Sequence, residues 1–158
     1  MADDYEGGTL EGTGPLKDNE AVRRGTVKFS LTKQGDQLVF GMEQVSGDKI
    51  VVDVNGEKCI AIWEHTIAEI VLADDLDWAL DTAAGTMSFK DQVNKRYYTI
   101  QPGGDRKFTL HARWTGKTPD DPQNHPFNLM VLLGQPGGGK PLPVTIDPDI
   151  KNPPPIWP

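Results

Sequence analysis

Cysteine is almost absent from this chain, which contains a single one, Cys59, among 158 residues. A lone thiol cannot form an intramolecular disulfide, so no disulfide framework holds the fold together. Long hydrophobic runs are also absent, because no stretch approaches the roughly 18 apolar residues that span a bilayer. The first residues lack the basic and apolar regions of a secretory signal peptide. We therefore expect a cytoplasmic protein.

Positive charge is scarce as well. The chain has 16 lysines and arginines against 23 aspartates and glutamates, which gives a formal net charge of −7. An acidic surface repels phosphate backbones and anionic lipids unless a local basic patch compensates. The only candidates are the pairs Arg23-Arg24 and Lys95-Arg96, and each pair is too short to form such a patch. We expect no nucleic-acid partner and no membrane partner.

Turn-forming residues, in contrast, are abundant, with 17 glycines and 13 prolines. The chain is long enough for one domain with a core and too short for two. Residues 1–24 are acidic and glycine-rich and bury too little apolar surface to order alone, so we expect a flexible N-terminal arm. Residues 25–150 are the predicted domain. Residues 151–158 form a predicted proline-rich tail.

Short strands separated by turns dominate the predicted domain. Val27, Phe29 and Leu31 alternate with polar residues, which is the period of a half-buried strand. Asn55-Gly56 separates two β-rich runs and predicts a hairpin with a type I′ turn. Further strands are predicted at residues 38–42, 86–89, 96–101, 107–114, 127–133 and 142–146.

Residues 66–81 fit two structures. Ile67, Ile70 and Val71 can lie on one helical face, whereas Glu69–Leu72 can equally form a strand. About eight strands with little helix are typical of an antiparallel sandwich or barrel. We predict an all-β fold, an antiparallel immunoglobulin-like β-sandwich of about eight strands with flexible termini.

The most catalytic-looking motif is the loop Gly134–Lys140, which matches Gly-x4-Gly-Lys and follows an apolar strand. Pro141 occupies the position of the hydroxyl residue that holds Mg²⁺ in phosphate-binding loops. The proline-rich sequence after it cannot form the helix whose N-terminus receives phosphate. We therefore interpret the motif as a hairpin loop between two strands.

Two groups of polar residues suggest metal sites. Asp74, Asp75, Asp77 and Asp81 are possible oxygen ligands for Ca²⁺, but they lack the glycine and glutamate spacing of a calcium loop. Aspartate at a helix start also caps free N–H groups. We favour a capped turn.

The histidines, His65, His111 and His125, match no zinc spacing, and Cys59 has no second cysteine beside it. Glu64-His65 and His111-x-Arg113 remain able to converge in space. Cys59 shares a strand face with Ala61 and Trp63, so it is expected to be an inert core thiol.

The tryptophans allow two interpretations. Exposed aromatic rings on a β-sandwich can stack on sugars, whereas Trp63 and Trp114 fit core packing. Trp157 lies in the proline-rich tail beside Ile156, where the pair can serve as an apolar docking element.

The C-terminal part of the chain resembles a known group of proteins. Residues 125–131 read HPFNLMV, and residues 141–155 read PLPVTIDPDIKNPPP. These segments are similar to those of small bacterial proteins catalogued as the DP-EP family, whose relatives carry the label "nucleotide synthetase". The chain has the Asp147-Pro148 element but no Glu-Pro. The resemblance implies a bacterial source and a β-sandwich fold, and it supplies no catalytic residues.

Without a convergent catalytic set, we predict a non-enzymatic protein-interaction or structural module that uses its ends or a sheet edge, with self-association possible. One alternative is a small-ligand or carbohydrate-binding domain with exposed aromatic residues. A nucleotide-acting enzyme that uses residues 134–140 is disfavoured. No catalytic, cofactor-binding or metal-binding residue is assigned.

Overall fold

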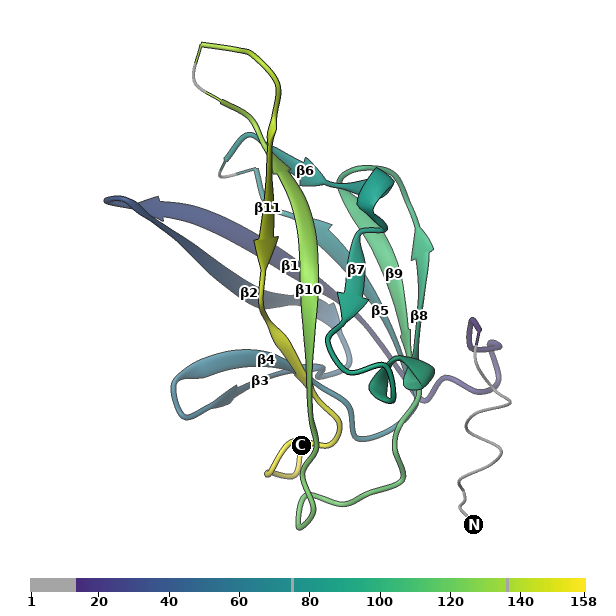
Figure 1. Ribbon diagram of the computed structural model, residues 1–158. Coiled ribbons are helices and arrows are strands. Elements are labelled where there is room, and N and C mark those ends of the chain that lie inside the picture. The colour runs from purple at the N-terminus through teal and green to yellow at the C-terminus, as the bar shows by residue number, and fades with distance from the viewer. Residues whose placement is uncertain (1–13, 75, 136) are drawn as a thin grey trace.

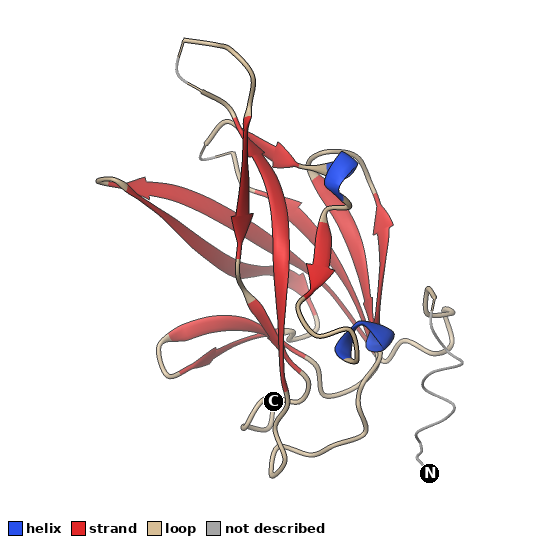
Figure 2. Cartoon of the chain, in the orientation of Figure 1, coloured by secondary structure: helices blue, strands red, loops and turns tan. Residues whose placement is uncertain are grey.

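The computed structural model describes residues 14–74, 76–135 and 137–158. Residues 1–13 of the predicted arm, Asp75 of the acidic cluster and Pro136 of the glycine loop lie outside the described residues. Strands dominate this part of the chain, and its only helical elements are two short 3-10 helices (Figures 1 and 2). The elements are β1 (Arg23–Gln34), β2 (Gln37–Gly47), β3 (Val51–Val54), β4 (Glu57–Ala61), β5 (Thr66–Leu72), β6 (Trp78–Leu80), η1 (Thr82–Ala84), β7 (Met87–Phe89), η2 (Asn94–Tyr97), β8 (Tyr98–Pro102), β9 (Lys107–Ala112), β10 (Asn124–Leu133), β11 (Leu142–Ile146) and β12 (Asp149–Lys151).

The first sheet has the strand order β2-β1-β5-β9-β8. Strands β1 and β2 form a long hairpin that projects from the body of the molecule (Figure 1). In β1, Val27, Phe29 and Leu31 are buried and alternate with more exposed residues, as predicted from the period of two. The polar face of β1 therefore lies on the outside of the sheet.

The second sheet is built around β10, in the order β11-β10-β12-β4-β3, with β6 and β7 also paired to β10. The β3–β4 hairpin turns at Asn55 and Gly56, whose φ angles are 55° and 84°. Both residues occupy the left-handed region that a type I′ turn requires, which confirms this hairpin.

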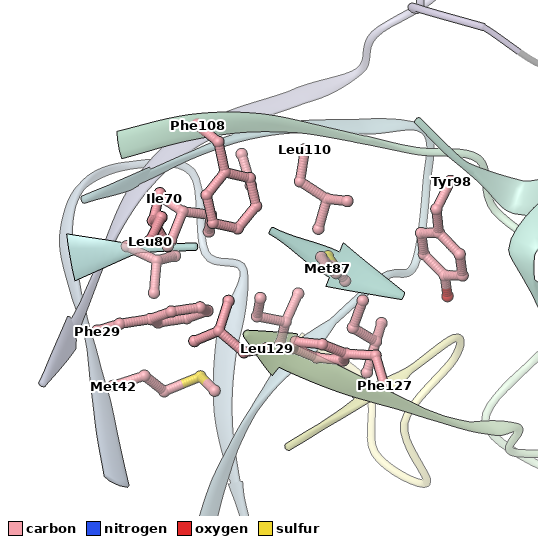
Figure 3. Packing of buried hydrophobic residues seen from close by; sticks show 14 of the residues in the cluster. Phe29, Met42, Ile70, Leu80, Met87, Tyr98, Phe108, Leu110, Phe127 and Leu129 are labelled. Carbon is pink, nitrogen blue, oxygen red and sulfur yellow. The ribbon is translucent and has the colours of Figure 1, made fainter. Parts of the chain in front are cut away.

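A single large core fills the space between the two sheets. Phe29, Ile70 and Phe108 from the first sheet meet Phe127 and Leu129 from the second, and all five are buried (Figure 3). The burial of these apolar side chains supplies the main favourable free energy of folding. The all-β prediction is confirmed. The immunoglobulin-like sandwich topology stays a prediction.

The sheets are mixed, whereas we predicted antiparallel ones. Strand β1 pairs in parallel with β5, and β12 pairs in parallel with β4. Parallel neighbours need a long connection, and here β2, β3 and β4 separate β1 from β5 along the chain. Short-range turn signals carry no information about such distant pairings.

Residues 66–81 contain strands in place of the alternative helix. Thr66, Ala68, Ile70 and Leu72 of β5 are buried and alternate with more exposed residues. A helix would have placed Ala68 and Ile70 on different faces. Packing against the core between the sheets therefore favours the strand, whose side chains alternate with a period of two.

In the described residues, no helix is long and apolar enough to cross a membrane.

Both terminal segments have packed residues. Leu16 is buried, and its backbone N–H donates to His111 Nδ1 over 3.1 Å. At the other end, Pro153 and Pro154 are buried, and the Trp63 indole N–H donates to the carbonyl oxygen of Ile156 over 2.8 Å. The predicted division of the chain at residues 24 and 150 stays a prediction.

Candidate functional site

Two cavities open at different edges of the sheets. One, of about 610 Å³, lies between β7 and β8 and is called the β7–β8 cavity below. It is lined by Met87, Ser88, Phe89, Gln92, Lys95, Arg96, Tyr98 and Ile100. The other, of about 710 Å³, lies beside β2 and is called the β2 groove. It is lined by Ser30, Phe40–Glu43, Asp53, Gly56–Lys58 and Ile146–Asp149.

Apolar side chains of two short strands build the floor of the β7–β8 cavity. Met87 and Phe89 of β7 and Tyr98 of β8 are buried members of the main core. The rings of Phe89 and Tyr98 stack with their centroids 4.4 Å apart and their planes at 10°. Both residues are more than nine-tenths buried, so only a small part of each is exposed to the cavity.

Two cationic side chains form the rim of this cavity. The short helix η2 leads directly into β8, so Lys95 and Arg96 are separated from the floor residue Tyr98 by Tyr97 alone. Arg96 Nη2 donates to the Tyr97 hydroxyl over 2.7 Å, and the Arg96 guanidinium carbon lies 4.8 Å from the Tyr97 ring centroid. Arg96 Nε is buried and has no hydrogen-bond partner among the residues that the structure describes. The Arg96 side chain is therefore oriented by Tyr97.

A buried polar network lies behind the floor. The Asn152 side-chain amide donates to the Tyr98 hydroxyl over 3.1 Å and to the Arg113 carbonyl over 2.9 Å. The Tyr98 hydroxyl lies 2.6 Å from His125 Nδ1. Which of these two groups donates depends on the imidazole tautomer. Burial lowers the pKa of His125 to about 4 and raises the pKa of Tyr98, so neither group is charged at neutral pH.

Charge distinguishes the two cavities. The β7–β8 cavity is lined by two cations and by no carboxylate. The β2 groove is lined by five carboxylates, those of Glu43, Asp53, Glu57, Asp147 and Asp149, and by one ammonium, that of Lys58. Charges of opposite sign therefore dominate the two linings.

The glycine loop belongs to neither cavity. It joins β10 to β11, which pair as antiparallel neighbours, so the motif lies in a hairpin loop as expected. Strand β11 follows the loop, where a phosphate-binding loop would continue into a helix. In the described part of the loop, Gln135 Nε2 donates to the Lys140 carbonyl over 2.7 Å.

The described residues of the acidic cluster, Asp74, Asp77 and Asp81, each make a different structural contact. Asp74 forms an ion pair with Arg106 at 2.7 Å, and Asp81 accepts a hydrogen bond from the Ala84 N–H at the start of η1. The carbonyl of Asp77 accepts from the Gly134 N–H. The capping role favoured for this cluster is confirmed at Asp81. Within the described ranges, no group of three or more His, Cys, Asp or Glu residues is placed to hold a metal ion.

The three histidines are distributed over two regions. His65 Nδ1 accepts from the Trp114 N–H over 2.9 Å, and His111 lies on the outer face of β9 beneath Leu16. Burial is the main cause that lowers the pKa of both imidazoles. His125 lies behind the floor of the β7–β8 cavity, and its ring stacks on Tyr97 with centroids 5.7 Å apart.

Cys59 is buried, but it lies outside the main core. It packs with Val52, Ala61 and Trp63 in a second, smaller core cluster, so the shared face with Ala61 and Trp63 and the core location are both confirmed. Burial raises the pKa of the Cys59 thiol to about 11, which keeps it protonated. Trp114 packs against the main core as expected, whereas Trp157 is 66% exposed.

Sequence reasoning missed the β7–β8 cavity. Lys95-Arg96 was dismissed because two basic residues cannot make a patch for nucleic acid. Two cations are enough for one phosphate group, and the two adjoining residues, Tyr97 and Tyr98, were a local signal of an aromatic surface beside them.

Comparison with known families gives one match. The family model pNTSase1, described as "Predicted novel nucleotide synthetase", matches residues 9–155. No curated protein matches the chain. The family match agrees with the C-terminal resemblance to proteins labelled "nucleotide synthetase". It overturns two expectations, namely that the protein is a non-enzymatic interaction or structural module and that a nucleotide-acting enzyme is disfavoured.

Proposed function

Since the chain belongs to the pNTSase1 family of predicted novel nucleotide synthetases, we propose that it is an enzyme that binds its nucleotide in the β7–β8 cavity. The observation that carries this proposal is the pair of cations, Lys95 and Arg96, at the rim of a cavity whose floor is apolar and aromatic. Nucleotides combine an anionic phosphate with a flat, largely apolar base. The cavity offers a surface for each part.

The phosphate part is assigned to the rim. Arginine presents several N–H donors in a planar fork that matches phosphate oxygens, and lysine adds a mobile point charge. Arg96 is already oriented by Tyr97, so little conformational entropy is lost when it binds an anion. No carboxylate in the lining opposes an incoming phosphate.

The base part is assigned to the floor. Met87, Tyr98 and the half-buried Ile100 supply apolar contact area. Gln92 and Ser88 are exposed at the edge of the cavity and can exchange hydrogen bonds with polar groups of the base or sugar. The neutral Tyr98–His125 pair behind the floor keeps this region uncharged.

Nucleotide titration tests the site. AMP, ADP and ATP are titrated by calorimetry against the wild-type protein, with and without Mg²⁺. Each of the variants Lys95→Ala and Arg96→Ala is expected to weaken binding by about tenfold or more, since a hydrogen bond to a charged group contributes roughly 1.5 to 3 kcal/mol. Lys58→Ala, which removes a lysine from the β2 groove, is the matched control and retains wild-type affinity. The proposal is rejected if the wild type binds none of the three nucleotides, or if all variants bind equally.

Product analysis tests the enzymatic part. The protein is incubated with ATP, GTP, CTP and UTP in the presence of Mg²⁺, and the products are analysed by mass spectrometry. Consumption by the wild type that is lost in a Lys95→Ala/Arg96→Ala double variant supports the proposal. We also propose a cytoplasmic location, where nucleotides are available as substrates, and cell fractionation tests it.

A further inference from the structure

Strand β2 has a free edge that differs from the other sheet edges. It is 11 residues long, lies outermost in its sheet and pairs only with β1 among the described strands. It contains no proline, lysine or arginine, which are the residues that commonly protect an edge strand from further pairing.

The remaining edges are short or carry proline. At the opposite end of the first sheet, β8 has five residues and ends at Pro102. In the second sheet, β3 has four residues, and β11 has five and includes Pro143. Among the described strands, β2 alone therefore offers a long row of backbone N–H and C=O groups to an incoming strand.

Strand β2 borders the β2 groove. Four consecutive residues of the strand, Phe40–Glu43, line the groove. Successive side chains of a strand point to opposite faces, so lining by four residues in a row means that the groove follows β2 along its length and is not confined to one face. Ser30 of β1, the partner of Gly41, lines it as well. The tip of the β3–β4 hairpin, with Asp53 and Glu57, lines it from another side.

Carboxylates dominate this lining. Three of them have lysine partners: Glu43 pairs with Lys28 at 3.7 Å, Asp147 with Lys90 at 3.2 Å, and Asp149 with Lys151 at 3.4 Å. None of these three lysines lines the groove. Asp53 and Glu57, at the hairpin tip, form no ion pair with the described residues. Asp53 and Glu57 are therefore the two carboxylates of the groove that can pair with a cationic occupant.

We propose that the β2 groove binds an extended, positively charged peptide segment of a partner protein, which adds to the free edge of β2 as a further strand. Main-chain hydrogen bonds hold such a segment, and alternate side chains meet the groove. Leu38 and Val39, 38% and 37% exposed on the same strand, offer apolar contacts beside the charged ones. A second copy of this chain fits less well, because its β2 strand carries only one charged residue, Glu43, and that charge is negative.

The first experiment measures binding of a defined probe to the full chain. The probe is a fluorescein-labelled peptide of alternating valine and lysine, followed by fluorescence polarisation. A peptide of equal length and charge, with proline in place of valine, cannot form the strand ladder and is the control. The valine–lysine peptide is expected to bind and the proline–lysine peptide is not. Equal binding of both peptides overturns the proposal, as does no binding of either.

The second experiment locates the site. The double variant Asp53→Asn/Glu57→Gln is expected to weaken binding about tenfold, because two exposed charge pairs are lost. Asp53→Asn keeps an oxygen that can accept from the Gly56 N–H, so the hairpin is preserved. The double variant Asp105→Asn/Asp120→Asn makes the same charge change at exposed positions outside both cavities and retains full affinity. Equal loss in both double variants means nonspecific attraction and overturns the proposal.

Hydrogen exchange and molecular mass complete the test. Peptide binding is expected to slow amide exchange within Gln37–Gly47, and unchanged exchange there overturns the proposal. A dimer in the absence of peptide, shown by light scattering and accompanied by slow amide exchange within Gln37–Gly47, also overturns the proposal, in favour of a second copy as the occupant. The Lys95→Ala and Arg96→Ala variants retain peptide binding, so failure of this proposal and failure of the nucleotide site are distinguishable.

Discussion

The buried imidazole of His125 makes the stability of the fold depend on pH. In the folded protein His125 is 3% exposed, its Nδ1 lies 2.6 Å from the Tyr98 hydroxyl, and burial lowers its pKa from 6.5 to about 4. In the unfolded chain the imidazole regains its ordinary pKa near 6.5. Between these two values the unfolded state binds a proton that the folded state does not. Stability is therefore complete above about pH 7 and falls with pH until about pH 4.

The size of this effect follows from the two pKa values. Between pH 7.5 and pH 4.5 the loss from His125 alone is about 2.5 kcal/mol, a large share of the usual 5 to 15 kcal/mol of a small domain. His65 and His111 also have lowered pKa values and add to the loss in the same direction. The measurement is urea unfolding followed by tryptophan fluorescence at both pH values.

The variant His125→Asn isolates the contribution of this residue. Asparagine has an oxygen that can accept from the Tyr98 hydroxyl, but it does not titrate. It is expected to be less stable than the wild type at pH 7.5, because the stacking on Tyr97 is lost, and to lose about 2.5 kcal/mol less on acidification. An equal loss in both proteins, or a pKa of 6 or higher for His125 by NMR titration, would refute the reasoning.

Further predictions concern packing, turn geometry, the N-terminal segment and the thiol. Phe127→Ala removes a fully buried ring and is expected to cost about 3 to 5 kcal/mol in urea unfolding. Gly56→Ala, at a φ of 84°, is expected to cost about 1 kcal/mol by the same measurement. Glu20 of the N-terminal segment forms an ion pair at 3.2 Å with the buried Arg113, so Glu20→Gln is expected to loosen this segment and to speed amide exchange at Leu16; unchanged exchange contradicts this expectation. Alkylation of Cys59 by iodoacetamide at pH 8 is expected to be about a hundredfold slower than for a free thiol, as followed by mass spectrometry.

Local features of the fold could be predicted from the sequence, and long-range ones could not. The Asn55-Gly56 turn depends on two residues whose φ preferences are intrinsic, so the sequence predicts the hairpin directly. Residues 66–72 fit both a helical and a strand period, and only the opposing sheet selects the strand. The parallel pairing of β1 with β5 depends on a connection of three strands, which no local pattern encodes.

The candidate site could not be predicted from the sequence either, because it also depends on long-range strand pairing. Lys95 and Arg96 are an ordinary basic pair in the sequence. They become the rim of a cavity only because β7 pairs with β10 while β8 pairs with β9, which brings Phe89 against Tyr98. In contrast, Gly134–Lys140 matches a sequence motif but lies in a hairpin loop. Spatial convergence, rather than motif spacing, identifies the site.

The parallel pairing of β12 with β4 constrains how the protein folds during its synthesis. Residues 150–151 pair with residues 60–61, so the β3–β4 hairpin, although local and able to form early, joins the second sheet only through a segment translated much later. Until that segment leaves the ribosome, one edge of β4 is unpaired and open to other extended chains. During synthesis the unpaired edge of β4 is therefore exposed for a time, and chaperones are expected to bind the nascent chain in this interval.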